Sequence, residues 1–215
     1  MGTVQFGAPA PCVNFLRDAL GLTMFVEGGT YRGGTARWAS ERFDRVVTIE
    51  NSPEMHAIAT RNLQGISNVD LRLGDSRQHL TEVCRHGDHV LYWLDAHWSG
   101  GVTYGAGDEC PLLDELRIIF AAHQNCAILI DDARLFLAPP PRPHQRSQWP
   151  TLVDLVNDIP AGWDCLCHDD VLSIIPDHVS DSYRDFMQSL ISPTASEDHK
   201  PKRSLVAKLF SRRAA

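Results

Sequence analysis

The sequence lacks any apolar run near the roughly 20 residues that a membrane-spanning helix needs. Its N-terminus also lacks the basic start and long apolar stretch of a signal peptide. Positive charge is in deficit, with a formal net charge of -7, whereas proteins that bind nucleic acid normally present a basic surface. We therefore expect a soluble, cytoplasmic protein with neither a membrane nor a nucleic-acid partner.

Cysteine is sparse, and the six cysteines form no CxxC pair. The closest pair is Cys165-x-Cys167, which is followed by His168. A zinc knuckle is one interpretation of this triplet, but we favour buried strand cysteines. With 215 residues, 43% of them hydrophobic, the chain can bury a sizeable core without disulfide bonds.

No long linker and no internal repeat interrupts the chain before its last part. We therefore predict a single domain over residues 1–192. Residues 193–215 are polar and become basic, which is typical of a disordered tail, with a short amphipathic docking helix as the alternative. A homodimer is compatible with this organisation.

Short apolar segments alternate with longer amphipathic ones in the first two thirds of the chain. We predict strands at 23–28, 45–50, 69–74, 89–96 and 126–132. We predict helices at 33–43, 52–65, 76–86 and 110–123. The last two strands are apolar up to their acidic ends, as in strands that are buried on both faces of a parallel sheet. This order predicts an α/β fold with a Rossmann-like, doubly wound, mostly parallel sheet.

The pattern changes after Asp132. Residues 138–150 are proline-rich and predict a loop or flap rather than regular structure. A helix near 151–158 follows, and then two short apolar segments joined tightly, which predict an antiparallel edge hairpin at the C-terminal end of the sheet. A weak helix is expected at 181–191.

The stretch "FVEGGTYRGGT" lies where the first strand turns into the first helix, which is where doubly wound sheets bind ligands. Its glycines allow close approach to a ligand. The spacing is Glu27-x-Gly29-x-x-x-Gly33 rather than the G-x-G-x-x-G of dinucleotide sites. Glu27 would repel a pyrophosphate but attract a cationic ligand. The candidate cofactor-binding residues here are Glu27, Gly28, Gly29, Thr30, Tyr31 and Gly33.

S-adenosylmethionine carries a sulfonium and an ammonium group but no phosphate, and E-x-G-x-x-x-G resembles the first motif of class I S-adenosylmethionine-dependent methyltransferases. Glu50 ends the second strand, where a carboxylate can accept both ribose hydroxyls. Asp75 and Ser76 follow the third strand, where members of that class often contact the adenine. The alternative for this pair is a plain helix N-cap, and the two roles are compatible.

Acidic residues also end the fourth and fifth strands. Asp95 ends "YWLD", with His97 two residues on, and Asp131 and Asp132 end "ILIDD". Carboxylates gathered at one edge repel one another unless a cation lies among them. Their oxygens suit Mg²⁺, which could bind a substrate hydroxyl and lower its pKa. His97 could then accept the proton.

Four segments, "EGGTYRGGT", "VVTIENSPE", "YWLDAHW" and "ILIDDA", together resemble the metal-dependent small-molecule O-methyltransferases of the catechol O-methyltransferase type. The resemblance covers about residues 23–135. It implies that Asp95, Asp131 and Asp132 hold the metal and that Glu50 binds the ribose, with Asp95 also at the cofactor. The catechol enzymes have a lysine base where this chain has Ser99-Gly100-Gly101, so His97 is the candidate base, as in sugar-methylating relatives.

The predicted function is divalent-metal-assisted methyl transfer from S-adenosylmethionine to a hydroxyl of a small molecule, a sugar or a natural product. Two alternatives remain: a non-catalytic binding or assembly protein on the same fold, and a metal-independent methyltransferase. A nicotinamide dehydrogenase ranks last because of Glu27.

Two loops are expected to wall the acceptor pocket. In residues 98–110, Glu109 is either a substrate contact or a helix N-terminal acid. Four side chains in residues 138–150 either bind the acceptor or are exposed loop residues, and we favour the second interpretation. They are Arg142, His144, Arg146 and Trp149. Asp114 and Glu115 are expected on a solvated helix face.

Overall fold

A computed structural model describes residues 7–86, 89–95, 107–123 and 125–192. The chain divides into two units, residues 1–183 and residues 184–215. The first unit contains the whole sheet. Residues 193–215, for which we predict a tail, lie outside the described ranges. No helix in those ranges combines the length and the apolar composition needed to cross a bilayer.

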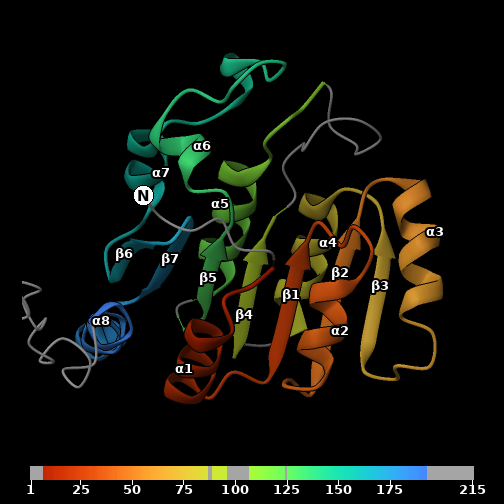
Figure 1. Cartoon of the computed structure of the whole chain (residues 1–215), viewed down its shortest axis with the longest axis horizontal. Helices are drawn as coiled ribbons and strands as arrows, with labels where there is room; N and C mark the ends of the chain where they lie inside the picture. Colours follow the sequence, from red (N-terminus) through yellow and green to blue (C-terminus); the bar gives the residue numbers. More distant parts are fainter. Residues whose placement is uncertain (1–6, 87–88, 96–106, 124, 193–215) are drawn as a thin grey trace, which may run out of the picture. The chain divides into compact units, whose positions relative to one another are not determined.

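The first unit is built on a seven-stranded sheet with the order β3-β2-β1-β4-β5-β7-β6. Strands β1 to β5 are parallel, and β7 pairs antiparallel with β5 and with β6. The doubly wound sheet and its antiparallel edge hairpin are therefore confirmed (Figure 1). The strands are β1 (Met24–Gly28), β2 (Arg45–Glu50), β3 (Val69–Leu73), β4 (Val90–Leu94), β5 (Ala127–Ile130), β6 (Trp163–His168) and β7 (Val171–Pro176).

Eight α-helices and two 3₁₀ turns lie in the described ranges. They are α1 (Ala10–Leu20), α2 (Gly34–Ser40), α3 (Pro53–Asn62), α4 (Ser76–Val83), η1 (Cys84–His86), α5 (Leu112–Ala122), α6 (Arg134–Leu137), η2 (Arg146–Gln148), α7 (Leu152–Asp158) and α8 (Asp177–Ile191). The boundary between the two units lies within α8, after Tyr183.

The central strands of the sheet are buried on both faces. On one face Val26, Tyr92 and Ile128 pack in a single cluster with side chains of α4, α5, α6 and α7. On the opposite face Phe25 of β1 meets Trp38 of α2 and Phe43, which follows that helix. Burial on both faces explains why the central strands are almost entirely apolar.

Local capping positions the helices that surround the site. Ser52 caps α3 by accepting a hydrogen bond from the amide of Met55, and Pro53 occupies the first helical position, as predicted. A capping box between Thr151 and Asp154 starts α7.

One helix was missed, and two expectations about burial are wrong. Helix α1 carries no strong start signal and was not predicted; its buried Val13 and Leu16 are what define it. Cys165 is half-exposed and Cys167 is exposed, because β6 is the outer strand. Glu115 is buried rather than solvated.

In the edge strand β6, one backbone amide is protected from pairing with a strand of another molecule. The amide of Cys165 in β6 donates to Oδ1 of Asp164, at 2.8 Å, so it is occupied within the strand. The other oxygen of Asp164 accepts a hydrogen bond from the hydroxyl of Ser180. An acid that covers an edge amide is a common device in sheets that end in water.

Gly33 ends the turn between β1 and α2 in a conformation that favours glycine. Its φ is +82°, and a Cβ built there would lie 3.0 Å from Cγ of Leu63. The neighbouring Gly34 has no such φ, and a Cβ there would meet nothing within 4 Å. The turn thus depends on one of its two consecutive glycines.

Gly33→Ala should lower the free energy of unfolding by about 1–3 kcal/mol, the usual cost of a left-handed non-glycine residue. Gly34→Ala is the matched control and should be neutral or stabilising by up to about 1 kcal/mol, because alanine favours the helix. Urea unfolding of the ligand-free protein measures both. Equal midpoints for the two variants would contradict the requirement for glycine at position 33.

Candidate active site

The predicted acidic residues lie at the carboxyl edge of the parallel strands, along the top of the sheet in Figure 1. Backbone hydrogen bonds connect the strand ends. The amide of Gly29 donates to the carbonyl of Ile49, that of Asp95 to Gly28, and that of Asp131 to Leu94. These bonds join β2, β1, β4 and β5 in order, so residues far apart in the sequence end at one edge of the sheet.

Glu27 lies in β1 and is 1% exposed. Its Oε2 accepts a hydrogen bond of 2.6 Å from the hydroxyl of Thr48, which is 2.5 Å from the hydroxyl of Thr30. Burial raises the pKa of Glu27 to about 8, although the hydroxyls of Thr48 and Thr35 oppose this. Glu27 therefore holds a proton at neutral pH in the ligand-free protein.

That raised pKa has a defined effect on folding. The folded protein retains a proton on Glu27 between pH 4.5, the ordinary value, and about pH 8. The contribution of Glu27 to stability is therefore greatest below this window and falls as pH rises through it. Ionised Glu27 is costly in the ligand-free fold, and a cation beside it would offset that cost.

Glu50 ends β2 and organises the glycine turn. Its Oε2 accepts from the amide of Tyr31, at 2.7 Å, and its Oε1 from the amide of Ser52, at 2.8 Å. Burial raises the pKa of Glu50, and these two amides oppose that shift. Each oxygen still has a lone pair for a ligand hydroxyl, since a carboxylate offers about four acceptor positions.

Glu27, Glu50 and Asp95 are electrostatically coupled. The charges of Asp95 and Glu50 both add to the upward shift in the pKa of Glu27. Three neighbouring carboxylates favour a ligand that carries positive charge and disfavour a phosphate. The residues present thus fit an amine- or sulfonium-bearing cofactor, and they argue against a dinucleotide.

Asp75 is the N-cap of α4, as one interpretation of the sequence holds. Its Oδ1 accepts from the amide of Arg77, at 2.9 Å. Hydrogen bonds from the Arg77 guanidinium hold the pKa of Asp75 below its ordinary value. Arg77 also reaches Asp108, at 2.6 Å, so this cap connects α4 to the segment before α5. Ser76, the first residue of the helix, is buried.

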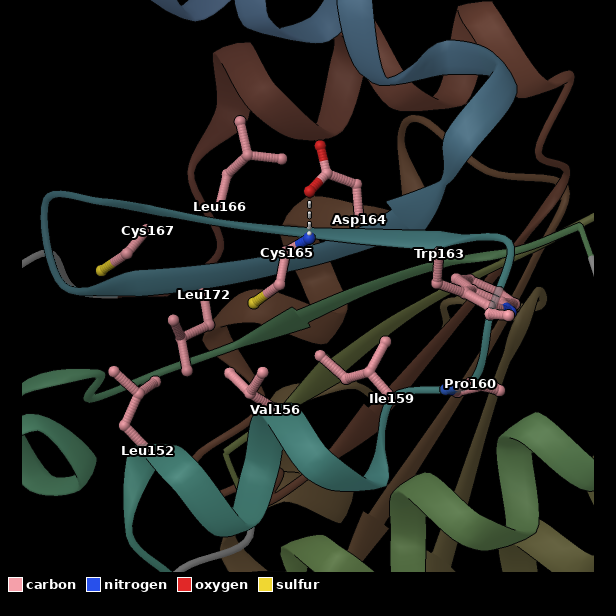
Figure 2. Close-up of a pocket in the computed structure, with 11 residues that line it drawn as sticks. Leu152, Val156, Ile159, Pro160, Trp163, Asp164, Cys165, Leu166, Cys167 and Leu172 are labelled. Carbon is pink, nitrogen blue, oxygen red and sulfur yellow. Dashed lines mark hydrogen bonds between the residues drawn. The ribbon is translucent and has the colours of Figure 1, made fainter.

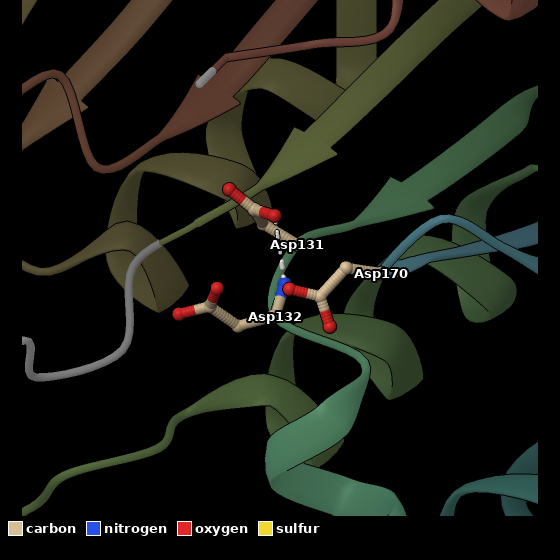
Figure 3. Close-up of side chains that lie close together, drawn as sticks. All are labelled: Asp131, Asp132 and Asp170. Carbon is tan, nitrogen blue, oxygen red and sulfur yellow. Dashed lines mark hydrogen bonds between the residues drawn. The ribbon is translucent and has the colours of Figure 1, made fainter. Parts of the chain in front are cut away.

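Asp131 and Asp132 lie next to each other at the end of β5, and Asp170 joins them from the β6–β7 turn (Figure 3). One carboxylate oxygen from each lies within 4.8 Å of the other two. The amide of Asp132 donates to Oδ1 of Asp131, at 2.7 Å. Within the part of the chain that the structure describes, these three form the one metal-capable group of His, Cys, Asp or Glu residues.

Sequence reasoning missed Asp170. Its only signal is the pair Asp169-Asp170 between two short strands, a pattern that also suits an ordinary turn. Both residues have positive φ, 52° and 107°. The predicted zinc knuckle alternative at Cys165, Cys167 and His168 does not form such a group in the described residues.

His97, the candidate base, lies outside the described residues, as do Ser99, Gly100 and Gly101. Asp95 is the last described residue of that segment and is half-buried.

Glu109 has a structural role that sequence reasoning did not anticipate. It is fully buried, and it accepts hydrogen bonds from Nε1 of Trp149, at 2.7 Å, and from the amide of Gln145, at 3.1 Å. Nδ1 of His144 lies 3.2 Å away. Burial alone would raise the pKa of Glu109, but these donors hold it below the ordinary value. The proline-rich loop is thus fastened to the start of α5.

A separate groove of about 550 Å³ lies between α7 and β6 (Figure 2). Its lining is mostly apolar, with Val156 and Ile159 on one side and the Cys165 side chain on the other. None of the predicted cofactor-binding, catalytic or carboxylate metal-site residues lines it.

The chain resembles several solved structures. A protein from Klebsiella pneumoniae described as an O-methyltransferase aligns with a TM-score of 0.59 and 14% identity, over 80% of this chain and 81% of that one. A methyltransferase from Podospora anserina, solved with SAH bound, aligns with a TM-score of 0.56 and 20% identity, over 77% and 76%. An O-methyltransferase from Bacillus cereus in complex with SAH aligns with a TM-score of 0.53 and 15% identity, over 78% and 81%.

Together with the strand order, these likenesses show that the chain has the Rossmann-like fold of class I methyltransferases. At such low identity they show the fold alone. No protein-family model matches the chain. The comparison with curated proteins returned no match either.

Glu109→Gln should lower the free energy of unfolding by about 2 kcal/mol at pH 7, because the buried donors lose a charged acceptor. The depressed pKa makes this contribution fully present above the unfolded pKa of 4.5 and lost as pH falls through the lower folded value. Urea unfolding at several pH values should therefore show the gap from wild type closing in acid.

The control is Asp108→Asn, which removes an exposed partner of Arg77 in the same segment. A surface ion pair contributes about 0–1 kcal/mol, so this variant should stay close to wild type. A gap for Glu109→Gln that is constant with pH would contradict the charge-assisted role.

Proposed function

We propose that this protein transfers a methyl group from S-adenosylmethionine to a hydroxyl of a small molecule. The observation that carries the proposal is a group of three carboxylates beside a glycine turn, of which Glu27 and Glu50 are buried and Asp95 is half-buried. This group repels phosphates and suits a ligand with a sulfonium and an ammonium. The methyltransferase fold and the SAH-bound neighbours from Podospora anserina and Bacillus cereus support the same cofactor.

In this proposal Glu50 accepts hydrogen bonds from the two ribose hydroxyls while its amide contacts hold the turn in place. Glu27 lies beside the positively charged end of the cofactor. The turn from Gly28 to Gly33 lets the backbone approach closely, and Asp75 and Ser76 lie toward the adenine. Fixing the donor in this way accounts for much of the rate by positioning.

We further propose that Asp95, Asp131 and Asp132 hold a divalent ion, with Mg²⁺ the best match to carboxylate ligands. When bound, such an ion would lower the pKa of a coordinated hydroxyl. The three residues contribute oxygen ligands and fix the acceptor at the edge of the sheet. His97 takes the hydroxyl proton, and the acceptor is a sugar or a natural product.

A metal-independent methyltransferase is the second candidate, and one observation favours it. The guanidinium of Arg134 lies 2.5 Å from Oδ1 of Asp132, so the acidic cluster already has a cation. Turnover that persists in EDTA, and in Asp131→Ala, would favour this candidate.

Calorimetry with S-adenosylmethionine tests the cofactor directly. Wild type should bind, and Glu50→Ala should bind roughly a hundredfold more weakly, because two charge-assisted hydrogen bonds are lost, at about 3 kcal/mol. Glu41→Ala, which removes an exposed acid at the opposite end of α2 from the turn, is the control and should bind like wild type. The absence of binding heat and of any thermal shift for wild type would favour the binding or assembly protein.

Cofactor binding should also release a proton at neutral pH. Glu27 has a pKa of about 8 in the ligand-free protein, and a neighbouring cation favours its ionised form. Affinity should therefore rise with pH up to about 8 and then level off. Calorimetry at pH 7 in buffers of different ionisation enthalpy should give a release of about one proton.

Glu27→Gln should abolish this proton release, because glutamine cannot ionise. Glu41→Gln should leave it unchanged. Equal binding heats for wild type in all buffers would show that Glu27 does not titrate on binding.

A further inference from the structure

The acidic cluster at the end of β5 contains a cation supplied by the chain itself. Arg134 begins α6, two residues after Asp132. Its Nη1 lies 2.5 Å from Oδ1 of Asp132 and also pairs with Oδ2 of Asp170. The Arg134 guanidinium thus bridges two of the three carboxylates that face one another.

Backbone contacts hold Arg134 in this position. Its amide donates to Oδ1 of Asp170, at 2.9 Å, and the amide of Ala133 donates to the carbonyl of Asp170, at 2.8 Å. Asp170 therefore fixes both ends of the residue, the amide at the start of α6 and the guanidinium beside Asp132. It reaches this place because the turn between β6 and β7 lies against the end of β5.

We propose that Arg134 is a built-in competitor for the divalent ion, held against Asp132 by Asp170, and that it lowers the affinity of the acidic cluster for metal. The inference rests on the proposed function, in which Asp131 and Asp132 are metal ligands. The guanidinium at 2.5 Å occupies one lone pair of Oδ1 of Asp132, so a divalent ion bound to this carboxylate would lie directly beside a positive charge. A divalent ion near Arg134 would be repelled by its charge.

The inference assigns Asp170 a role different from that of Asp131 and Asp132. Asp170 sets the metal affinity through Arg134 and is not itself a metal ligand. It also explains how three close carboxylates are tolerated in the ligand-free fold, since Arg134 neutralises part of their charge.

Mn²⁺ binding tests the competition without any need for turnover, followed through the paramagnetic resonance signal of the free ion. Arg134→Gln should bind Mn²⁺ at least about tenfold more tightly than wild type, because a repelling charge and a competing ion pair are removed. Arg134→Lys keeps the charge and should stay within about threefold of wild type. Mn²⁺ should also raise the melting temperature of Arg134→Gln more than that of wild type.

A double-mutant cycle tests the role of Asp170. Asp170→Asn should tighten Mn²⁺ binding in the wild-type background, because Arg134 is then no longer held against Asp132. In the Arg134→Gln background the same change should alter affinity by no more than about threefold. A tenfold loss there would make Asp170 a metal ligand and overturn the division of roles.

Equal or weaker Mn²⁺ affinity in Arg134→Gln would overturn the competition outright. S-adenosylhomocysteine calorimetry on the same preparations shows that each variant is folded. If no variant binds Mn²⁺ while S-adenosylhomocysteine still binds, both the proposed metal site and the proposed competition by Arg134 are wrong. The assignment of the cofactor is then unaffected. If S-adenosylhomocysteine fails to bind a folded wild type, the proposed function itself is wrong.

Discussion

Repulsion among carboxylates at one edge of a parallel sheet is the constraint on which the rest of this molecule depends. A parallel sheet directs all its carboxyl ends to one side, so acids that end separate strands gather there. This chain compensates their charge in three different ways. Glu27 keeps a proton, Glu50 accepts two backbone amides, and Asp132 pairs with Arg134. Each of these arrangements leaves a place that a positively charged ligand can take over.

The fold follows from local signals to a large extent. Apolar strands, the Ser52–Pro53 helix start and the tight final pair of strands were enough to predict the parallel sheet and its antiparallel hairpin. These features are readable because each depends on neighbours in sequence or on simple periodicity. Helix α1 is different, because its helical pattern acquires meaning only when Val13 and Leu16 pack against the sheet.

Contacts between distant segments were beyond sequence reasoning. Glu109 was expected to be either a substrate contact or a helix N-terminal acid, yet its partners Trp149 and Gln145 lie more than thirty residues away and hold a loop in place. Asp170 likewise reaches Asp132 and Arg134 only through the placement of a turn. In both cases the sequence gives the charge of the side chain but does not identify the segment that it will contact. His97, Asp95 and the metal ligand set remain predictions.

The acid on the outer strand has a consequence for the behaviour of the protein at high concentration. Asp164 accepts the amide of Cys165 within β6, so that group is not free to pair with a strand from another molecule. An exposed edge strand with unpaired backbone amides can template the addition of strands from other molecules and so lead to fibrils. The local hydrogen bond and its negative charge make such growth unfavourable at this border, although its thiols are accessible. Asp164 thus disfavours self-association by β-strand extension at the β6 edge.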